Sequence, residues 1–376
     1  MSGWRHLNRA ACAVAVAAAL ALVLAGGAGA SARQPFLAGL HAVSRIASTV
    51  PASGPATGDQ NPYGTAVVPR SVGKLVRGDV LVSNFNDAAN AQGTGSSIVE
   101  VSPGGRVKVF AAIPKPTSTP AVGLTTALVA LRSGYVIVGS LPAPGGQASA
   151  AGAGALTVLD AHGRVVESFR GGEVKGPWDL TAVDSGRRVV LFVTNVLNGT
   201  VAANGATVDR GTVVRITLQI PPGHAPRLTS ERVIATGFAE HTDPNALIVG
   251  PTGVALGAHG VLYVADPAGN RITVIPDALD RTRAANSGGT TVAHGGRLAS
   301  PLGLTIAPDG DVLTVNAGDG QIIETTPSGT EIASRTLITD GAGDLFGLAV
   351  APNARGIYFV DDAGSGTGAN SLALLH

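Results

Sequence analysis

The sequence predicts an all-β protein, a six-bladed β-propeller of four-stranded antiparallel blades. A cassette recurs in which Pro-x-Gly, or a variant of it, precedes a short apolar strand, a Gly-marked turn and a second strand ending in Asn or Asp. Pro251 and Pro301 begin two copies 50 residues apart, and all-strand repeats of about 40 to 50 residues are typical of propeller blades. The copies begin at Asn61-Pro62-Tyr63-Gly64, Gly176-Pro177-Trp178-Asp179, Gly250-Pro251-Thr252-Gly253 and Ser300-Pro301-Leu302-Gly303, with looser ones at Ala121-Val122-Gly123 and Leu345-Phe346-Gly347.

The strands of each blade follow from alternating apolar and polar residues beside Gly and Pro turns, the pattern of half-buried strands. In blade one, Ser97-Ile98-Val99-Glu100-Val101 leads through Ser102-Pro103-Gly104-Gly105 into an outer strand. The expected strands are 65–68, 80–83, 97–101 and 107–110 in blade one, 135–138, 155–159 and 165–169 in blade two, 189–193 and 212–216 in blade three, 260–266 and 270–275 in blade four, 311–316 and 321–325 in blade five, and 356–361 and 371–375 in blade six.

Blade four carries the clearest motif. Tyr263-Val264-Ala265-Asp266, followed after a tight loop by Asn270-Arg271-Ile272, resembles the core of an NHL repeat. The resemblance covers about residues 60 to 376 and implies a six-bladed propeller. It implies no single activity, because such propellers include binding scaffolds, lyases and lactonases.

The two ends of the repeat region predict how the ring closes. Blade six has one strand after Asp361, at 371–375, and then the chain stops, so its outer strand is missing. Residues 41–50 alternate apolar with polar before blade one begins. We expect this N-terminal segment to supply the missing strand, which would remove an open sheet edge.

The first residues have the composition of a secretory leader. Arg5 and Arg9 precede an apolar run from Ala10 to Leu24, and small residues follow it. We therefore predict a signal peptide at 1–30, a mobile leader at 31–40, the propeller at 41–376, a secreted or periplasmic location, and no membrane span after signal removal. Cys12 is the single cysteine and lies in the apolar run, so disulfides and cysteine chemistry are excluded from the rest of the chain.

Charge disfavours nucleic acid as a partner. Without Arg5 and Arg9 the chain has 24 Lys and Arg against 25 Asp and Glu, and the sequence contains no basic stripe. Nucleic-acid binding depends on neutralising phosphates. The expected partner is an unknown small molecule or an extracellular protein.

Candidate ligand-binding residues gather on one face of the predicted ring. Strands of a blade alternate in direction, so the start of each inner strand and the loop between strands two and three share a face. Asp179 replaces the cassette glycine, and Trp178 beside it resembles a ligand shelf. The alternative is structural: Asn and Asp often cap turns at strand ends. The predicted ligand-binding set is Asp179, Trp178, Asn195, Asn84, Asn86 and Asp87.

The same face suggests a metal site. The chain is distantly similar to gluconolactonase-like propellers, which carry an acidic residue at the start of an inner strand and Asn and Asp side chains around one divalent ion. That resemblance implies Ca²⁺ or another divalent cation held by Asp179, Asn195, Asn84 and Asp361. The family's inner-strand glutamate has no counterpart in blade one, where Tyr63-Gly64 stands.

Two functions follow from these observations. The first is a secreted, NHL-like, non-catalytic binding or scaffold module with its ligand at the channel mouth. The alternative is a metal-dependent hydrolase of the lactonase or esterase type. The sequence identifies no catalytic residue, and it contains no His-Glu-x-x-His, Gly-x-Ser-x-Gly or Walker pattern.

Overall fold

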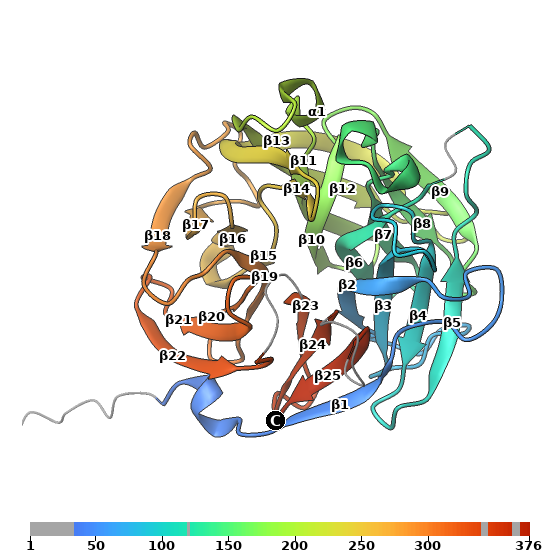
Figure 1. Cartoon of the computed structure of the whole chain (residues 1–376), viewed down its shortest axis with the longest axis horizontal. Helices are drawn as coiled ribbons and strands as arrows, with labels where there is room; N and C mark the ends of the chain where they lie inside the picture. The colour runs from blue at the N-terminus through green and yellow to red at the C-terminus, as the bar shows by residue number, and fades with distance from the viewer. Residues whose placement is uncertain (1–33, 119–120, 340–344, 363–368) are drawn as a thin grey trace, which may run out of the picture. The chain divides into compact units, whose positions relative to one another are not determined.

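A computed structural model describes residues 34–118, 121–339, 345–362 and 369–376, and Pro35–His376 form one compact unit. Six antiparallel sheets surround a central axis (Figure 1), which confirms the predicted six-bladed propeller. The predicted signal peptide at 1–30 lies outside the described residues. Within the described part of the chain, no helix is long and apolar enough to cross a membrane.

The blades follow one another in chain order, and each begins with its inner strand. Blade one contains β2 (Gln60–Val67), β3 (Val80–Asn86), β4 (Ser97–Val101) and β5 (Val107–Ala112), and blade two contains β6 (Leu124–Ala130), β7 (Val136–Ser140), β8 (Ala155–Leu159) and β9 (Val165–Arg170). Blade three contains β10 (Gly176–Asp184), β11 (Arg188–Val196), β12 (Val208–Gln219), β13 (Arg227–Asp243) and β14 (Leu247–Val249).

The second half of the ring repeats the pattern. Blade four contains β15 (Val254–Leu256), β16 (Leu262–Asp266), β17 (Arg271–Ile275) and β18 (Thr290–His294), and blade five contains β19 (Pro301–Ile306), β20 (Val312–Asn316), β21 (Gln321–Thr325) and β22 (Glu331–Thr336). Blade six contains β23 (Leu345–Val350), β24 (Ile357–Asp361), β25 (Ser371–Leu375) and β1 (Val43–Ser48). The helices described are α1 (Thr200–Ala203) and the 3₁₀ turns η1 (Phe36–Gly39), η2 (Pro144–Gly146), η3 (Ala148–Ala150) and η4 (Ala258–Gly260).

The N-terminal strand closes the ring as predicted. β1 pairs antiparallel with β25, from Val43 opposite Leu375 to Ser48 opposite Ser371. In Figure 1 the blue β1 runs beside the red β25. Blade six therefore has four strands drawn from both ends of the chain.

The propeller unit begins earlier than the predicted boundary at residue 41. Pro35–Leu40, which we expected to belong to a mobile leader, lie within the compact unit. The side chain of Leu37 is fully buried, and the backbone N–H groups of Phe36 and Leu37 each donate to Glu324 over 2.7 Å. This contact could not be predicted from local sequence, because Glu324 is 287 residues away from Leu37.

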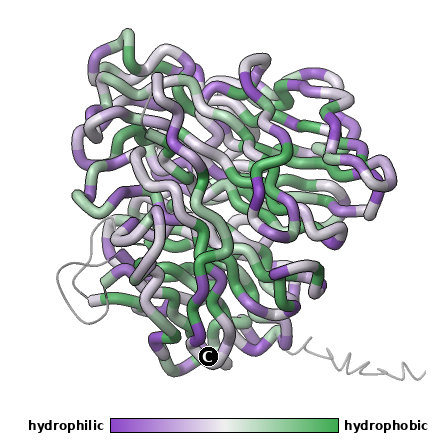
Figure 2. The backbone as a smooth tube through the Cα atoms, turned by 90° about the vertical axis from the view of Figure 1, so that its right-hand side faces the viewer, coloured by the Kyte–Doolittle hydropathy of each residue, from purple (hydrophilic) through white to green (hydrophobic). Residues whose placement is uncertain are grey.

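The apolar core lies in layers between neighbouring blades. Leu81 and Ile98 of blade one pack with Leu128 and Val138 of blade two, and equivalent clusters occupy the other blade interfaces. Middle strands such as β3 are buried along their whole length, because a blade covers each of their faces. In Figure 2 hydrophobic segments run through the body of the molecule, and many hydrophilic segments lie at outer bends of the tube.

The cassette glycines lie where adjacent inner strands approach closely. A Cβ on Gly64 would lie 2.9 Å from the Cβ of Leu128 in blade two, and one on Gly347 would lie 2.9 Å from the Thr65 backbone nitrogen in blade one. Blade three has Asp179 at this position. The inner strands beside Asp179 therefore leave room for its carboxylate.

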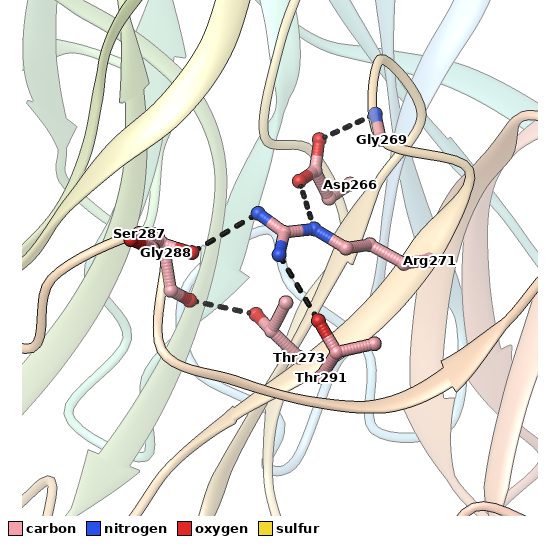
Figure 3. Close-up of polar contacts among 7 residues, drawn as sticks. All are labelled: Asp266, Gly269, Arg271, Thr273, Ser287, Gly288 and Thr291. Carbon is pink, nitrogen blue, oxygen red and sulfur yellow. Dashed lines mark hydrogen bonds and ion pairs between the residues drawn. The ribbon is translucent and has the colours of Figure 1, made fainter.

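The NHL-like residues stabilise blade four (Figure 3). The fully buried Asp266 accepts hydrogen bonds from the Gly269 backbone and from Nε of Arg271, which lies 2.7 Å away. Arg271 also donates to Thr291 Oγ1 and to the Ser287 carbonyl. Asn270 joins the loop to blade five by accepting from the Ser300 N–H. The contacts of this motif are thus contacts within the fold.

Candidate functional site

The face on which the inner strands begin holds a cavity of about 420 Å³, here called the mouth cavity. Its walls come from the first residues of several inner strands, from the loop after β3 and from the β13–β14 hairpin. Cavities of this size accommodate small organic molecules. The predicted mouth of the channel is therefore a real concave site.

An aromatic cluster lies on the inner side of the mouth cavity. Tyr63 stacks on Phe346 with ring centroids 3.9 Å apart and on Phe85 at 4.4 Å. Trp178 meets the edges of Tyr63 and Phe85, at 6.1 and 5.7 Å. Trp178 is only 5% exposed, so it is both part of this packed layer and part of the cavity wall. These rings bring blades one, three and six together at the axis.

Tyr63 also connects this layer to polar groups. Burial raises the pKa of its phenol well above the ordinary value, the charge of Asp362 raises it further, and a hydrogen bond to the Asn61 side chain partly offsets both effects. The phenol is therefore neutral at physiological pH. Asn61 and Asp362 line the mouth cavity beside it.

Three amide residues of the cavity wall share an unusual feature. The side-chain oxygens of Asn61, Asn86 and Gln92 are buried and have no hydrogen-bond partner among the described residues. An unsatisfied buried acceptor costs about 1–3 kcal/mol. A bound molecule that donates hydrogen bonds to this wall would remove part of that cost.

Two long connections meet over the mouth cavity. Gln92, in the loop after β3, donates from Nε2 to the carbonyl of Asn245, in the turn between β13 and β14. Asn245, Ile248 and Gln92 all line the cavity. The loop after β3 was expected on this face because it connects strands two and three, but the β13–β14 hairpin was not predicted. The apolar run Leu247-Ile248-Val249 is too short to predict a strand from sequence.

A second cavity of about 290 Å³, here called the channel cavity, lies along the axis beyond the aromatic layer. On the inner strands of blades one, three and six the residues that line it follow those that line the mouth cavity: Thr65 follows Tyr63, Asp179 follows Trp178, and Gly347 follows Phe346. The aromatic cluster therefore stands between the two cavities.

Asp179 belongs to the channel cavity and bridges two blades. Its carboxylate accepts from the Leu180 N–H at 2.8 Å and from the Val254 N–H of blade four at 3.2 Å. Burial raises its pKa to about 8, and these two backbone hydrogen bonds lower it only in part. No basic side chain among the described residues pairs with it. Asp179 is thus a substantially protonated carboxyl near neutral pH.

The structure divides the predicted ligand-binding set. Trp178 and Asn86 line the mouth cavity, whereas Asp179 lines the channel cavity. Asp87 lies next to this wall in sequence, and its Oδ1 accepts the N–H groups of Ala89 and Ala91, which shapes the loop. Both of these hydrogen bonds lie within the loop that contains Asp87.

Asn84 and Asn195 line neither cavity. Both are fully buried at the ends of second strands. Asn195 Oδ1 accepts the N–H groups of Lys175 and Gly176, and its amide donates to Glu173 and Thr212. Asn84 donates to the Thr49 carbonyl and to Ser97. The hydrogen bonds of both asparagines therefore stabilise the blades.

These positions fit a shared metal ion poorly. Both acceptor directions of the Asn195 oxygen are already used by backbone N–H groups, and Asp179 faces a different space from the two asparagines. Asp361 ends β24 opposite Leu345 and Ser371. A metal site shared by Asp179, Asn195, Asn84 and Asp361 stays a prediction, and no reaction step is assigned to a metal ion.

One acidic group was not predicted from sequence. Ligand oxygens of Asp309, Asp311 and Glu324 lie within 4.8 Å of one another, at the face opposite the mouth, where strands one and two of blade five connect. Asp-Gly-Asp at 309–311 is a weak signal because the same residues form ordinary turns. Glu324 also accepts the N–H groups of Phe36 and Leu37.

Comparison with known proteins defines the fold more than the activity. No family model matches the chain, and no curated protein matches it. A protein provisionally named a gluconolactonase is 16% identical, with 91% of this chain and 95% of that chain covered and a TM-score of 0.54. The calcium-binding protein regucalcin from Agrobacterium tumefaciens is 13% identical, with 85% and 91% covered and a TM-score of 0.53.

A third structure is a gluconolactonase from Xanthomonas campestris, 13% identical, with 88% of each chain covered and a TM-score of 0.51. These identities show a shared fold, and one fold hosts many activities. The chain is a six-bladed β-propeller whose architecture resembles that of gluconolactonase-like propellers.

Proposed function

We propose that the mouth cavity binds a small polar organic molecule that donates hydrogen bonds. The observation that carries this proposal is the set of three unpartnered amide oxygens, on Asn61, Asn86 and Gln92, around one cavity of about 420 Å³. Hydroxyl or amine groups of a ligand would satisfy these acceptors. Trp178 and Tyr63 would cover its apolar part.

The second candidate is a lactonase-type or esterase-type hydrolase. The names of similar structures, two gluconolactonases and regucalcin, favour this candidate over a non-catalytic scaffold. The side chains at the mouth favour binding, since the predicted metal ligands share no cavity. Both candidates place the small molecule in the mouth cavity, so one experiment tests them together.

The experiment uses the full chain with Trp4→Phe, which leaves Trp178 as the single tryptophan. Glucose, gluconate and spermidine are titrated while Trp178 fluorescence is recorded, and hydrolysis of glucono-lactone is measured with and without added Ca²⁺. We expect a saturable fluorescence change with at least one probe. Gln92→Ala should weaken the affinity for that probe by about fivefold or more, as expected for one lost hydrogen bond.

Gln219→Ala is the matched control, because Gln219 is an exposed glutamine at the end of β12, outside the mouth cavity. Saturable binding without lactone turnover supports the binding module. Calcium-dependent turnover that Gln92→Ala reduces supports the hydrolase. Equal effects of both glutamine substitutions, or no response to any probe and no turnover, would overturn the placement of function at the mouth.

The proposal includes export from the cytoplasm. Its support is the basic, then apolar, then small-residue order of residues 1–30. N-terminal sequencing of the protein recovered from periplasm and medium tests it. A chain that keeps Met1 and stays in the cytoplasm would contradict export.

A further inference from the structure

Three arginines gather at the face of the ring opposite the mouth. Arg70, Arg132 and Arg187 follow the inner strands β2, β6 and β10, in the connections that lead to the second strands of blades one, two and three. Because the inner strands begin at the mouth face, these connections lie at the opposite face. All three side chains line one shallow cavity of about 580 Å³, here called the arginine cavity.

Blades two and three build the rest of the arginine cavity. Tyr135, which immediately precedes β7 in blade two, donates from its hydroxyl to the His224 carbonyl over 2.9 Å. His224 closes a turn in which its N–H donates to the Pro221 carbonyl. Tyr135, Pro221 and His224 are all part of the cavity wall. The hydrogen bond of Tyr135 therefore fixes the turn of blade three against blade two.

The three guanidinium groups have no acidic partner. Across the described ranges, the guanidinium groups of Arg70, Arg132 and Arg187 make no hydrogen bond and no ion pair with another residue. The carboxylate beside them is Asp184, and its two oxygens accept the backbone N–H groups of Arg132 at 2.7 Å and Gly186 at 2.8 Å. Like charges that share a cavity repel one another, and a bound anion would remove that repulsion.

Not every blade has a basic residue in the connection between its first and second strands. The equivalent connection in blade five holds Asp309 and Asp311 in place of a basic residue. The net charge of the whole chain is only +1, so the positive patch comes from placement and not from composition. In sequence the arginines are more than 50 residues apart.

We propose that the arginine cavity binds a ligand with two or more oxyanion groups, such as a diphosphate or a polycarboxylate. Guanidinium groups bind phosphate and carboxylate oxygens through pairs of parallel hydrogen bonds. Three of them around one cavity match an anion with several such oxygens. This site is separate from the mouth cavity and independent of the function proposed there.

Inorganic pyrophosphate and citrate are the probes, and binding is measured by calorimetry at low ionic strength with the full chain. Arg132→Gln with Arg187→Gln removes two charges at exposed positions. We expect pyrophosphate affinity to fall about 100-fold, roughly tenfold for each charge-assisted interaction lost. Arg283→Gln is the matched control, because Arg283 is exposed, its guanidinium has no partner among the described residues, and it lies outside the arginine cavity, in the connection between β17 and β18.

A second arm identifies the source of the oxyanion. Vesicles of phosphatidylglycerol are compared with vesicles of phosphatidylcholine in co-sedimentation. Binding of pyrophosphate or citrate supports a soluble ligand, and selective sedimentation with phosphatidylglycerol supports a lipid headgroup, provided that the double variant abolishes it. Absence of binding in both arms, or an equal loss with Arg283→Gln, would overturn the proposal. Thermal melts of each variant confirm that the fold is intact.

Discussion

Trp178 and Asp179 are neighbours in the chain but line different cavities. The pairing of β10 with β11 shifts register between Pro177 and Asp179, so this part of the inner strand does not follow simple alternation. Trp178 packs in the aromatic layer at the mouth, and Asp179 reaches across to the Val254 N–H. A pair that looks like one binding element in sequence therefore has two separate roles.

Asp179→Asn should change the pH dependence of stability. The folded protein raises the pKa of Asp179 from 3.8 to about 8, so it binds this proton more tightly than the unfolded chain does. The stability that Asp179 contributes is full below about pH 4 and is lost as the pH rises to about 8. The free energy of unfolding of the variant, relative to wild type, should therefore increase across this window.

We expect that relative gain to be about 2 kcal/mol, because Asp179 is partly exposed and solvent screening reduces the full linkage effect. Urea unfolding at pH 4.5, 6, 7 and 8.5 measures it. Asp87→Asn is the control, since Asp87 is a partly exposed carboxylate in the loop after β3, outside the channel cavity. Parallel curves for wild type and Asp179→Asn would show that Asp179 ionises normally.

Trp178→Ala should destabilise the protein strongly. The ring contacts Tyr63 and Phe85 and is 5% exposed, and truncating a buried aromatic side chain to alanine costs about 3–5 kcal/mol. Trp178→Phe keeps an aromatic ring and should lose less than half as much. Denaturant unfolding separates the two. A loss below 1 kcal/mol for Trp178→Ala would mean that the aromatic layer does not hold the mouth together.

Asp266→Ala should show that the NHL-like motif is structural. The substitution leaves Arg271 without its 2.7 Å ion pair and Gly269 without its acceptor, which is expected to cost about 3 kcal/mol. Asp319→Ala changes the exposed aspartate of the corresponding blade-five loop and should cost about 0.5 kcal/mol. Chemical denaturation compares them. Similar small losses would refute the structural role of Asp266.

Ring closure can be tested with two deletions. Removing residues 33–51 deletes β1 and exposes the edge of β25, so we expect a lower melting temperature and aggregation. Removing 33–40 keeps β1 and loses the contacts of Leu37 and the bonds to Glu324, so its effect should be smaller. Calorimetry and light scattering provide the readout. Equal melting temperatures for wild type and the longer deletion would argue against closure through β1.

The fold was predictable because its signals are local and repeated. Alternation within each strand, the cassette glycines and the approximate period together gave the blade number and the closing strand. Phe36–Gly39 and the β13–β14 hairpin were missed, since each depends on contacts outside its own segment: Leu37 on Glu324, and Asn245 on Gln92.

The candidate site was predictable only in part. The sequence alone determined that one face of the ring collects Asn, Asp and aromatic side chains, because the direction of each strand fixes the face on which it begins. Which of these side chains share a cavity depended on the tertiary structure. Asn195 has its hydrogen bonds within its own blade, Asp179 reaches the next blade, and Asn61 and Gln92 both line the mouth cavity. These contacts depend on how closely the inner strands of different blades approach one another at the axis. The apolar and polar pattern within a strand does not encode that distance.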